Sequence, residues 1–131
     1  MRPEPFFSGP GLDRADPLRA DPQAIAELAR SPQARQLEWR EGLPAIGEDG
    51  LLVWRGVEAP DLFLGLDGDE PRFSAVPPAV EGSRAAFGTM GNLSPAQAPI
   101  FAAALSLGGW HGRHRFCANC GAQTGIVRGG W

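Results

Sequence analysis

The hydrophobic pattern of this chain changes its period twice, and the changes limit the folds that the chain can adopt. Residues 21–29 combine an Asp-Pro helix start with apolar residues at helical spacing. Between residues 36 and 76 the apolar residues instead form short, strand-like runs separated by Gly- and Asp-rich turns. A second helical stripe occupies residues 100–107. This order predicts an α+β fold: a small, mainly antiparallel sheet with flanking helices.

Turn signals divide the strand region into short segments. Glu48-Asp49-Gly50 and Asp67-Gly68-Asp69-Glu70 are typical of hairpin turns. The last helix is expected to begin at Ser94-Pro95 and to weaken at Gly108-Gly109, and residues 1–21 to form an irregular, proline-rich arm. The expected strands are 37–40, 45–46, 51–54, 61–66 and 72–76, with a further short strand at 84–87. The expected core is Leu37, Trp39, Leu52, Trp54, Leu62, Leu64, Phe73, Phe101 and Leu105.

Two cysteines carry the clearest chemical signal in the sequence. Cys117 and Cys120 are the only cysteines and form a C-x-x-C-G knuckle, in which Gly121 permits a tight turn behind the second sulfur. Two thiolates at this spacing can reach one metal ion, but a structural zinc site needs four ligands, usually from two such knuckles. Since only 11 residues follow Cys120, we expect half of a zinc site and a chain cut from a longer protein.

Other interpretations of the cysteine pair are weaker. His111 and His114 continue the three-residue spacing and could complete four ligands from one segment. They also look like the continuation of the preceding helix, which favours a surface or interface role. A thioredoxin-type redox pair would sit between a strand and a helix within a βαβ unit, whereas this pair lies near the end of the sequence.

Charge is distributed unevenly along the chain. All 15 acidic residues lie in residues 1–81, beside eight arginines, and residues 82–131 carry four arginines and no acid. A basic end could face nucleic acid, although four arginines over 50 residues are few for such a surface. The sequence contains neither a signal-peptide pattern nor an apolar run long enough for a membrane span, so a cytoplasmic protein is expected.

Catalytic motifs are missing from this sequence. It contains no G-x-S-x-G, no phosphate-binding G-x-x-x-x-G-K-[ST] loop and no H-E-x-x-H. Asp67, Asp69 and Glu70 could suggest a divalent ion, but acids between two strands are more often a solvated turn. Four strand aromatics are better explained as core than as a base-stacking platform: Trp39, Trp54, Phe63 and Phe73.

The segment from Trp110 to Thr124, followed by Gly129-Gly130-Trp131, resembles the NADH pyrophosphatases of the Nudix hydrolase superfamily. The resembling residues read W-H-x-R-H-R-F-C-x-x-C-G-A-x-T. Leu12-Asp13-Arg14-Ala15 and the hairpin-rich middle also look like the family's N-terminal domain. The resemblance implies a non-catalytic, Nudix-like N-terminal domain at residues 1–108. It also implies the first knuckle of a truncated zinc ribbon at residues 109–131.

Family membership would imply hydrolysis of the pyrophosphate of NADH or NAD to nicotinamide mononucleotide and AMP, and related enzymes also remove NAD caps from RNA. The family's Nudix helix, whose glutamates hold Mg²⁺ or Mn²⁺, has no counterpart in this sequence. The resemblance therefore implies no catalytic residue here, zinc on Cys117 and Cys120, and a scaffolding role. This chain alone is expected to be inactive.

The sequence leaves open two functions of other classes. A free-standing knuckle module could complete its zinc site by homodimerisation, with two cysteines from each chain. A nucleic-acid adaptor would instead use the basic end of the chain and would bind RNA with strong salt dependence. The alternatives differ in zinc content, oligomeric state and RNA affinity.

Overall fold

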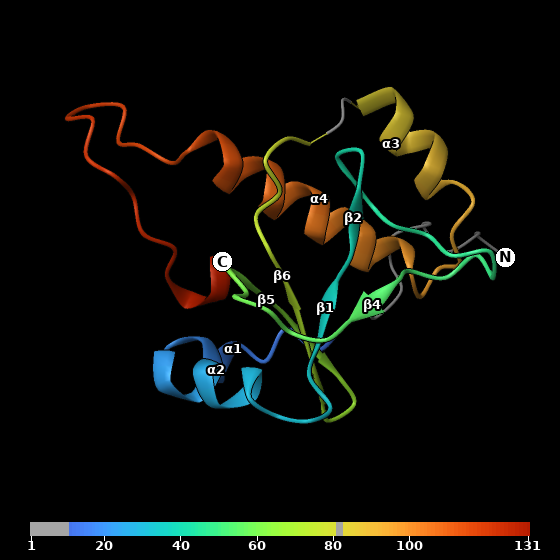
Figure 1. Cartoon of the computed structure of the whole chain (residues 1–131), viewed down its shortest axis with the longest axis horizontal. Helices are drawn as coiled ribbons and strands as arrows, with labels where there is room; N and C mark the ends of the chain where they lie inside the picture. The colour runs from blue at the N-terminus through green and yellow to red at the C-terminus, as the bar shows by residue number, and fades with distance from the viewer. Residues whose placement is uncertain (1–10, 81–82) are drawn as a thin grey trace, which may run out of the picture.

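A computed structural model describes residues 11–80 and 83–131 (Figure 1). The helices are α1 (Asp16–Arg19), α2 (Pro22–Ala29), α3 (Ser83–Met90), α4 (Ala98–Arg113) and the 3₁₀ turn η1 (Arg128–Gly130). The strands are β1 (Arg35–Leu37), β2 (Trp39–Arg40), β3 (Leu43–Pro44), β4 (Trp54–Arg55), β5 (Leu62–Asp67) and β6 (Glu70–Ser74). The first ten residues of the expected irregular arm lie outside the described residues, and α1 forms within the rest of it.

Four strands form the main sheet in the order β4-β1-β6-β5. Strand β1 runs antiparallel to β4 and parallel to β6, and the β5–β6 hairpin is antiparallel, with an irregularity between Phe63 and Gly65. Strands β2 and β3 form a separate two-stranded ladder. Helix α4 crosses the sheet on one side, whereas α1 and α2 lie together at its opposite end (Figure 1). The predicted α+β class, with a mostly antiparallel sheet and flanking helices, is confirmed.

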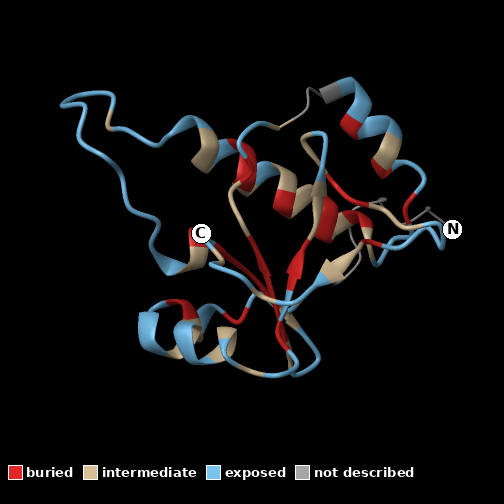
Figure 2. Ribbon diagram, viewed as in Figure 1, coloured by how far each residue is buried: buried red, intermediate tan, exposed pale blue. Residues whose placement is uncertain are grey.

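The core has two parts, separated by the alternating side chains of β5. Leu64 packs in the larger cluster with Leu37 and the buried face of α4, whereas Phe63 packs with Phe73 in a smaller cluster beside α2. Buried residues concentrate where the sheet meets α4 (Figure 2). Six of the nine predicted core residues are fully buried, and Trp39, Trp54 and Leu105 are partly buried against the larger cluster.

The first predicted helix forms as its sequence indicates. Helix α2 begins at Pro22, and the side chain of Asp21 accepts a hydrogen bond from the backbone amide of Gln23 at 3.0 Å. This cap satisfies one of the amides that the first helical turn leaves unpaired. The predicted turn at residues 67–70 also forms, since Asp67 pairs with Glu70 at the end of the β5–β6 hairpin.

The expected strand at residues 84–87 is wrong, because this segment belongs to α3. Ala86 and Met90, one helical turn apart, are buried in the larger cluster, whereas Phe87 points outward and is 64% exposed. A strand would place Gly88 on the same face as Ala86 and Met90, but Gly88 is exposed, whereas a helix brings residues four apart together without the residue between them. The buried pair is therefore matched by the helical period.

Helix α4 differs from the prediction at both ends. It begins at Ala98 rather than at Ser94-Pro95, and the carbonyl of Ser94 accepts the amides of Gln97 and Ala98 in a preceding turn. It then continues through Gly108-Gly109 to Arg113, so the expected boundary at residue 108 falls inside a helix.

Close packing explains the glycine at residue 108. A Cβ atom there would lie 3.0 Å from Cδ of Pro77 and 3.2 Å from Cη2 of Trp39. The missing side chain lets α4 approach the Trp39 ring closely, which outweighs the helix propensity that a larger residue would add.

Candidate metal centre at the cysteine hairpin

The cysteine hairpin begins where α4 ends. His114 caps the helix with φ −114° and ψ 43°, and its backbone amide donates to the carbonyl of Trp110 at 3.0 Å. The imidazole of His114 stacks on the Trp110 ring at 4.1 Å and hydrogen-bonds through Nδ1 to the Trp110 carbonyl at 2.6 Å. Because a carbonyl only accepts, Nδ1 carries the proton. These contacts turn the chain out of the helix and into the hairpin.

Backbone hydrogen bonds close the hairpin around the two cysteines. The amide of Cys117 donates to the carbonyl of Ala122, and the amide of Gly121 donates to the carbonyl of Cys117, both at 2.8 Å. Gly121 has φ +73°, a conformation that glycine adopts without steric cost. The amide of Thr124 donates to the backbone carbonyl of Arg115 at 2.9 Å and extends the pairing. The knuckle that the C-x-x-C-G pattern predicts is therefore present as a turn.

The sulfur atom of Cys117 lies in a turn that favours its anionic form. Hydrogen bonds from the backbone amide of Cys120, then from that of Asn119, and from the Cys120 side chain lower the pKa of the Cys117 thiol. Both cysteines are free thiols, with Cys117 half-buried and Cys120 exposed. Since the thiolate is the metal-binding form, this turn suits a thiophilic ion such as zinc.

The cysteine pair supplies only part of a metal shell. Among residues 11–80 and 83–131, no group of three or more His, Cys, Asp or Glu side chains could hold a metal ion. His111 is occupied elsewhere: its Nε2 donates to the carbonyl of Gly130 at 2.9 Å. The structure thus does not bring His111 or His114 together with the cysteines as a four-ligand cluster.

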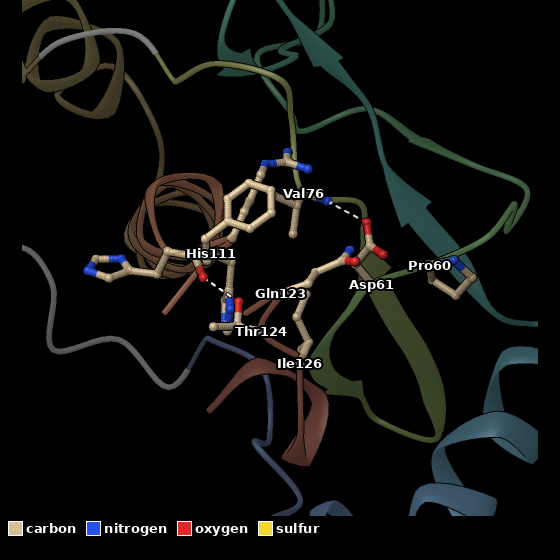
Figure 3. Close-up of a pocket in the computed structure, with 10 residues that line it drawn as sticks. Pro60, Asp61, Val76, His111, Gln123, Thr124 and Ile126 are labelled. Atoms are coloured by element: carbon tan, nitrogen blue, oxygen red, sulfur yellow. Dashed lines mark hydrogen bonds between the residues drawn. The ribbon is translucent and has the colours of Figure 1, made fainter. Parts of the chain in front are cut away.

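An open groove of about 550 Å³ separates the hairpin from one end of the main sheet. Pro60, Asp61 and Val76 line the sheet side, and Gln123, Thr124 and Ile126 are among the lining residues of the hairpin side (Figure 3). Asp61 accepts a hydrogen bond from the backbone amide of Val76 at 2.9 Å. The carboxylate is therefore used to hold the ends of β5 and β6 together.

Two of the three acids in the turn between β5 and β6 are paired with a neighbouring arginine. The guanidinium of Arg72 lies 2.6 Å from the carboxylate of Glu70 and 3.8 Å from that of Asp67. It also lies over the Trp54 ring, 5.4 Å from its centroid. This pairing supports the interpretation of Asp67, Asp69 and Glu70 as a solvated structural turn.

One of the three arginines near the hairpin is paired with an acid. Arg113 and Arg115 are exposed beside Phe116, whose ring is 64% exposed. Arg128 is committed to Asp16, with 2.7 Å between Nη2 and the carboxylate. The nucleic-acid interpretation therefore rests on fewer arginines than the sequence offers.

Arg19 is a buried charge that no pattern of its own segment predicts. This side chain is only 2% exposed and lies over the Phe63 ring, 4.8 Å from its centroid. Its Nη1 donates to the carbonyl of Arg128 at 3.2 Å. The one available signal was Gly129-Gly130-Trp131, because adjacent glycines often mark a close approach of the backbone to another element.

Comparisons with known proteins identify no family for this chain. No protein-family model matches the sequence, and no curated protein matches it either. No helix of the described residues combines the length and the apolar character needed to cross a membrane.

Proposed function

We propose that this chain is the N-terminal region of an NAD(H) diphosphatase of the Nudix superfamily. In this proposal the parent enzyme hydrolyses the pyrophosphate of NADH or NAD to nicotinamide mononucleotide and AMP, and this region acts as a scaffold. The observation that carries the proposal is the cysteine hairpin, with Cys117 inside a turn of amide donors and the Trp110–Trp131 signature around it. An NAD-capped RNA would be a second substrate class of the same enzyme.

The distribution of acids supports a scaffolding role. Pyrophosphate cleavage by Nudix enzymes needs several carboxylates that hold Mg²⁺ or Mn²⁺. Residues 82–131 contain no acid, and Asp67 and Glu70 of the β5–β6 turn are paired with Arg72. The divalent ions and their glutamates are therefore assigned to a catalytic domain outside this chain.

The zinc site is proposed to take two ligands from this chain and two from elsewhere. Cys117 and Cys120 would bind the ion as thiolates, and a second knuckle of the parent protein would supply the remaining pair. Bound zinc would lock the ribbon and would supply no chemistry to the reaction. Cys120 is exposed, so it is open to an approaching segment.

The exposure of Cys120 equally suits a second candidate, a binding module in which two copies of the chain share one zinc ion. That arrangement also gives four thiolates, two per chain. It predicts a zinc-dependent dimer with one zinc for two chains, whereas the scaffold proposal predicts a monomer.

Incubation with NADH tests the assignment of catalysis to another domain. Purified chain with Mg²⁺ or Mn²⁺ is expected to release no AMP, while an authentic Nudix NADH diphosphatase added under the same conditions shows that the assay works. AMP release that follows the protein through purification and stops on addition of EDTA would contradict the scaffold proposal.

A further inference from the structure

Residues 128–131, which we call the Gly-Gly-Trp latch, lie against the main sheet far from the hairpin that precedes them. Their turn, η1, packs beside β5 and α2, and the end of the chain lies next to β5 in Figure 1. The intervening residues 118–127 are all exposed. The hairpin is therefore held to the rest of the fold at two places, α4 and the latch.

Two glycines let the latch backbone approach β5 closely. A Cβ atom on Gly129 would lie 2.8 Å from Cβ of Phe63, and one on Gly130 would lie 2.6 Å from Cδ2 of Leu62. Their φ angles are +65° and +106°, which larger residues adopt only with strain. Both space and backbone conformation thus require glycine at these positions.

Polar side chains of the folded domain anchor the latch backbone. Nε2 of His111 donates to the carbonyl of Gly130 at 2.9 Å, and Nη1 of Arg19 donates to the carbonyl of Arg128 at 3.2 Å. His111 comes from α4 and Arg19 from α1. Two elements from opposite ends of the sequence therefore converge on the latch.

The Trp131 ring completes the contact. It lies under two guanidinium groups, 4.4 Å from that of Arg14 and 5.1 Å from that of Arg19. Its indole nitrogen donates to the carbonyl of Phe63 at 3.4 Å. An aromatic face favours a cation held above it, so the ring offsets part of the cost of burying Arg19.

The hairpin builds its own turn without the latch. The bonds that close it join residues 114–117 to residues 121–124, and none involves residues 128–131. The local geometry of the two cysteines is therefore independent of the latch, whereas the direction in which the hairpin leaves the domain depends on it.

We propose that the Gly-Gly-Trp latch is a docking segment that binds in cis to a site formed by Arg14, Arg19, Leu62, Phe63 and His111. Its role is to fix the position of the cysteine hairpin against the sheet before any metal binds. The proposal stands on contacts within this chain and does not require the diphosphatase function. If the chain is a scaffold, the latch sets where the completed zinc site points.

Trypsin tests whether the latch is docked. Trypsin must bind the chain around the Arg128–Gly129 bond in an extended conformation, which docking of the latch opposes although the Arg128 side chain is exposed. Arg115 is also exposed, but it lies in the hairpin, whose backbone is held by hydrogen bonds between residues 114–117 and 121–124. With each bond normalised to its rate in unfolded chain, cleavage after Arg128 is expected to be at least about tenfold slower than after Arg115. Equal normalised rates in the wild-type chain would overturn the proposal.

Matched glycine variants separate docking from chain flexibility. Gly130→Ala is expected to raise cleavage after Arg128 to the rate seen after Arg115, because its Cβ meets Leu62. Gly125→Ala adds the same methyl group where nothing lies within 4 Å, and its cleavage should stay at the wild-type rate. His111→Ala tests the same site without changing the latch sequence and should also speed cleavage after Arg128.

Cobalt binding provides a readout that the latch should not change. Titration with Co²⁺, followed by thiolate-to-metal absorption, is expected to give the same affinity for Gly130→Ala as for the wild-type chain. Circular dichroism shows that each variant is folded. A folded Gly130→Ala variant that keeps wild-type protection at Arg128 would contradict the docking of the latch, and one that loses cobalt binding would contradict the independence of latch and hairpin.

Discussion

Nη1 of Arg19 donates a hydrogen bond to the backbone carbonyl of Arg128 at 3.2 Å, across 109 residues of sequence. Desolvation by burial lowers the pKa of Arg19 to about 10, so the side chain remains charged at neutral pH. Its Nη2 atom is buried and has no hydrogen-bond partner among the described residues. The contact thus places an incompletely paired charge between the first helix and the latch.

Removing the imidazole of His111 is expected to destabilise the fold by about 1 kcal/mol, because the Gly130 carbonyl then loses its donor. Urea unfolding of His111→Ala measures the change. His114→Ala is the matched control: that imidazole bonds within its own helix to Trp110 and is exposed. Equal destabilisation by both variants would show that the Gly130 contact has no special weight.

Alanine at residue 108 should lower the thermal stability, although alanine is the better helix former by about 1 kcal/mol. The new Cβ would lie 3.0 Å from Pro77 and 3.2 Å from the Trp39 ring, and such overpacking costs about 1–3 kcal/mol.

Gly112→Ala is the comparison for Gly108→Ala, because its Cβ would make only ordinary contacts, at 3.7 Å from Pro77 and 3.9 Å from Val76. This variant is expected to keep or raise the melting temperature. If Gly108→Ala raised it as well, the close packing of α4 on Trp39 would not be what selects glycine at this position.

The Cys117 thiol is expected to react at lower pH than an ordinary cysteine, because amide hydrogen bonds from Cys120 and Asn119 lower its pKa. Alkylation by iodoacetamide requires the thiolate, so its rate rises as pH passes the pKa. The rate–pH profile of Cys117 in a Cys120→Ser variant should therefore turn upward below that of a short unstructured peptide. If the profile of Cys117 coincided with that of the peptide, the turn would not stabilise the Cys117 thiolate.

Replacing both cysteines by serine should leave the melting temperature of the chain almost unchanged. The hairpin is mostly exposed, whereas the two core clusters lie in the sheet and its helices. Differential scanning calorimetry of Cys117→Ser/Cys120→Ser without added metal measures this. A large drop would mean that the knuckle is a complete structural site within this chain.

Local patterns with a direct physical cause were predictable from the sequence. The Asp21 cap, the turn at residues 67–70 and the C-x-x-C-G knuckle each depend on a few adjacent residues. The α+β class followed from the change in hydrophobic period. In each case the information needed was contained in one short segment.

Tertiary contacts decided the features that the sequence did not predict. The segment at residues 84–87 is helical because Ala86 and Met90 pack together on the larger cluster, and Gly108 sits in a helix because Trp39 packs against it. Burial of Arg19 depends on residues 63 and 128–131, which are distant in sequence. No local window of sequence contains such contacts.

The metal stoichiometry of the cysteine pair tests the scaffold proposal most directly. Native mass spectrometry with a titration of Zn²⁺ measures zinc per chain and oligomeric state together. Two ligands from one chain should give a monomer that binds zinc weakly and loses it to a mild chelator. A zinc-dependent dimer holding one tightly bound ion for two chains would contradict the scaffold proposal and would establish a module completed by its own second copy.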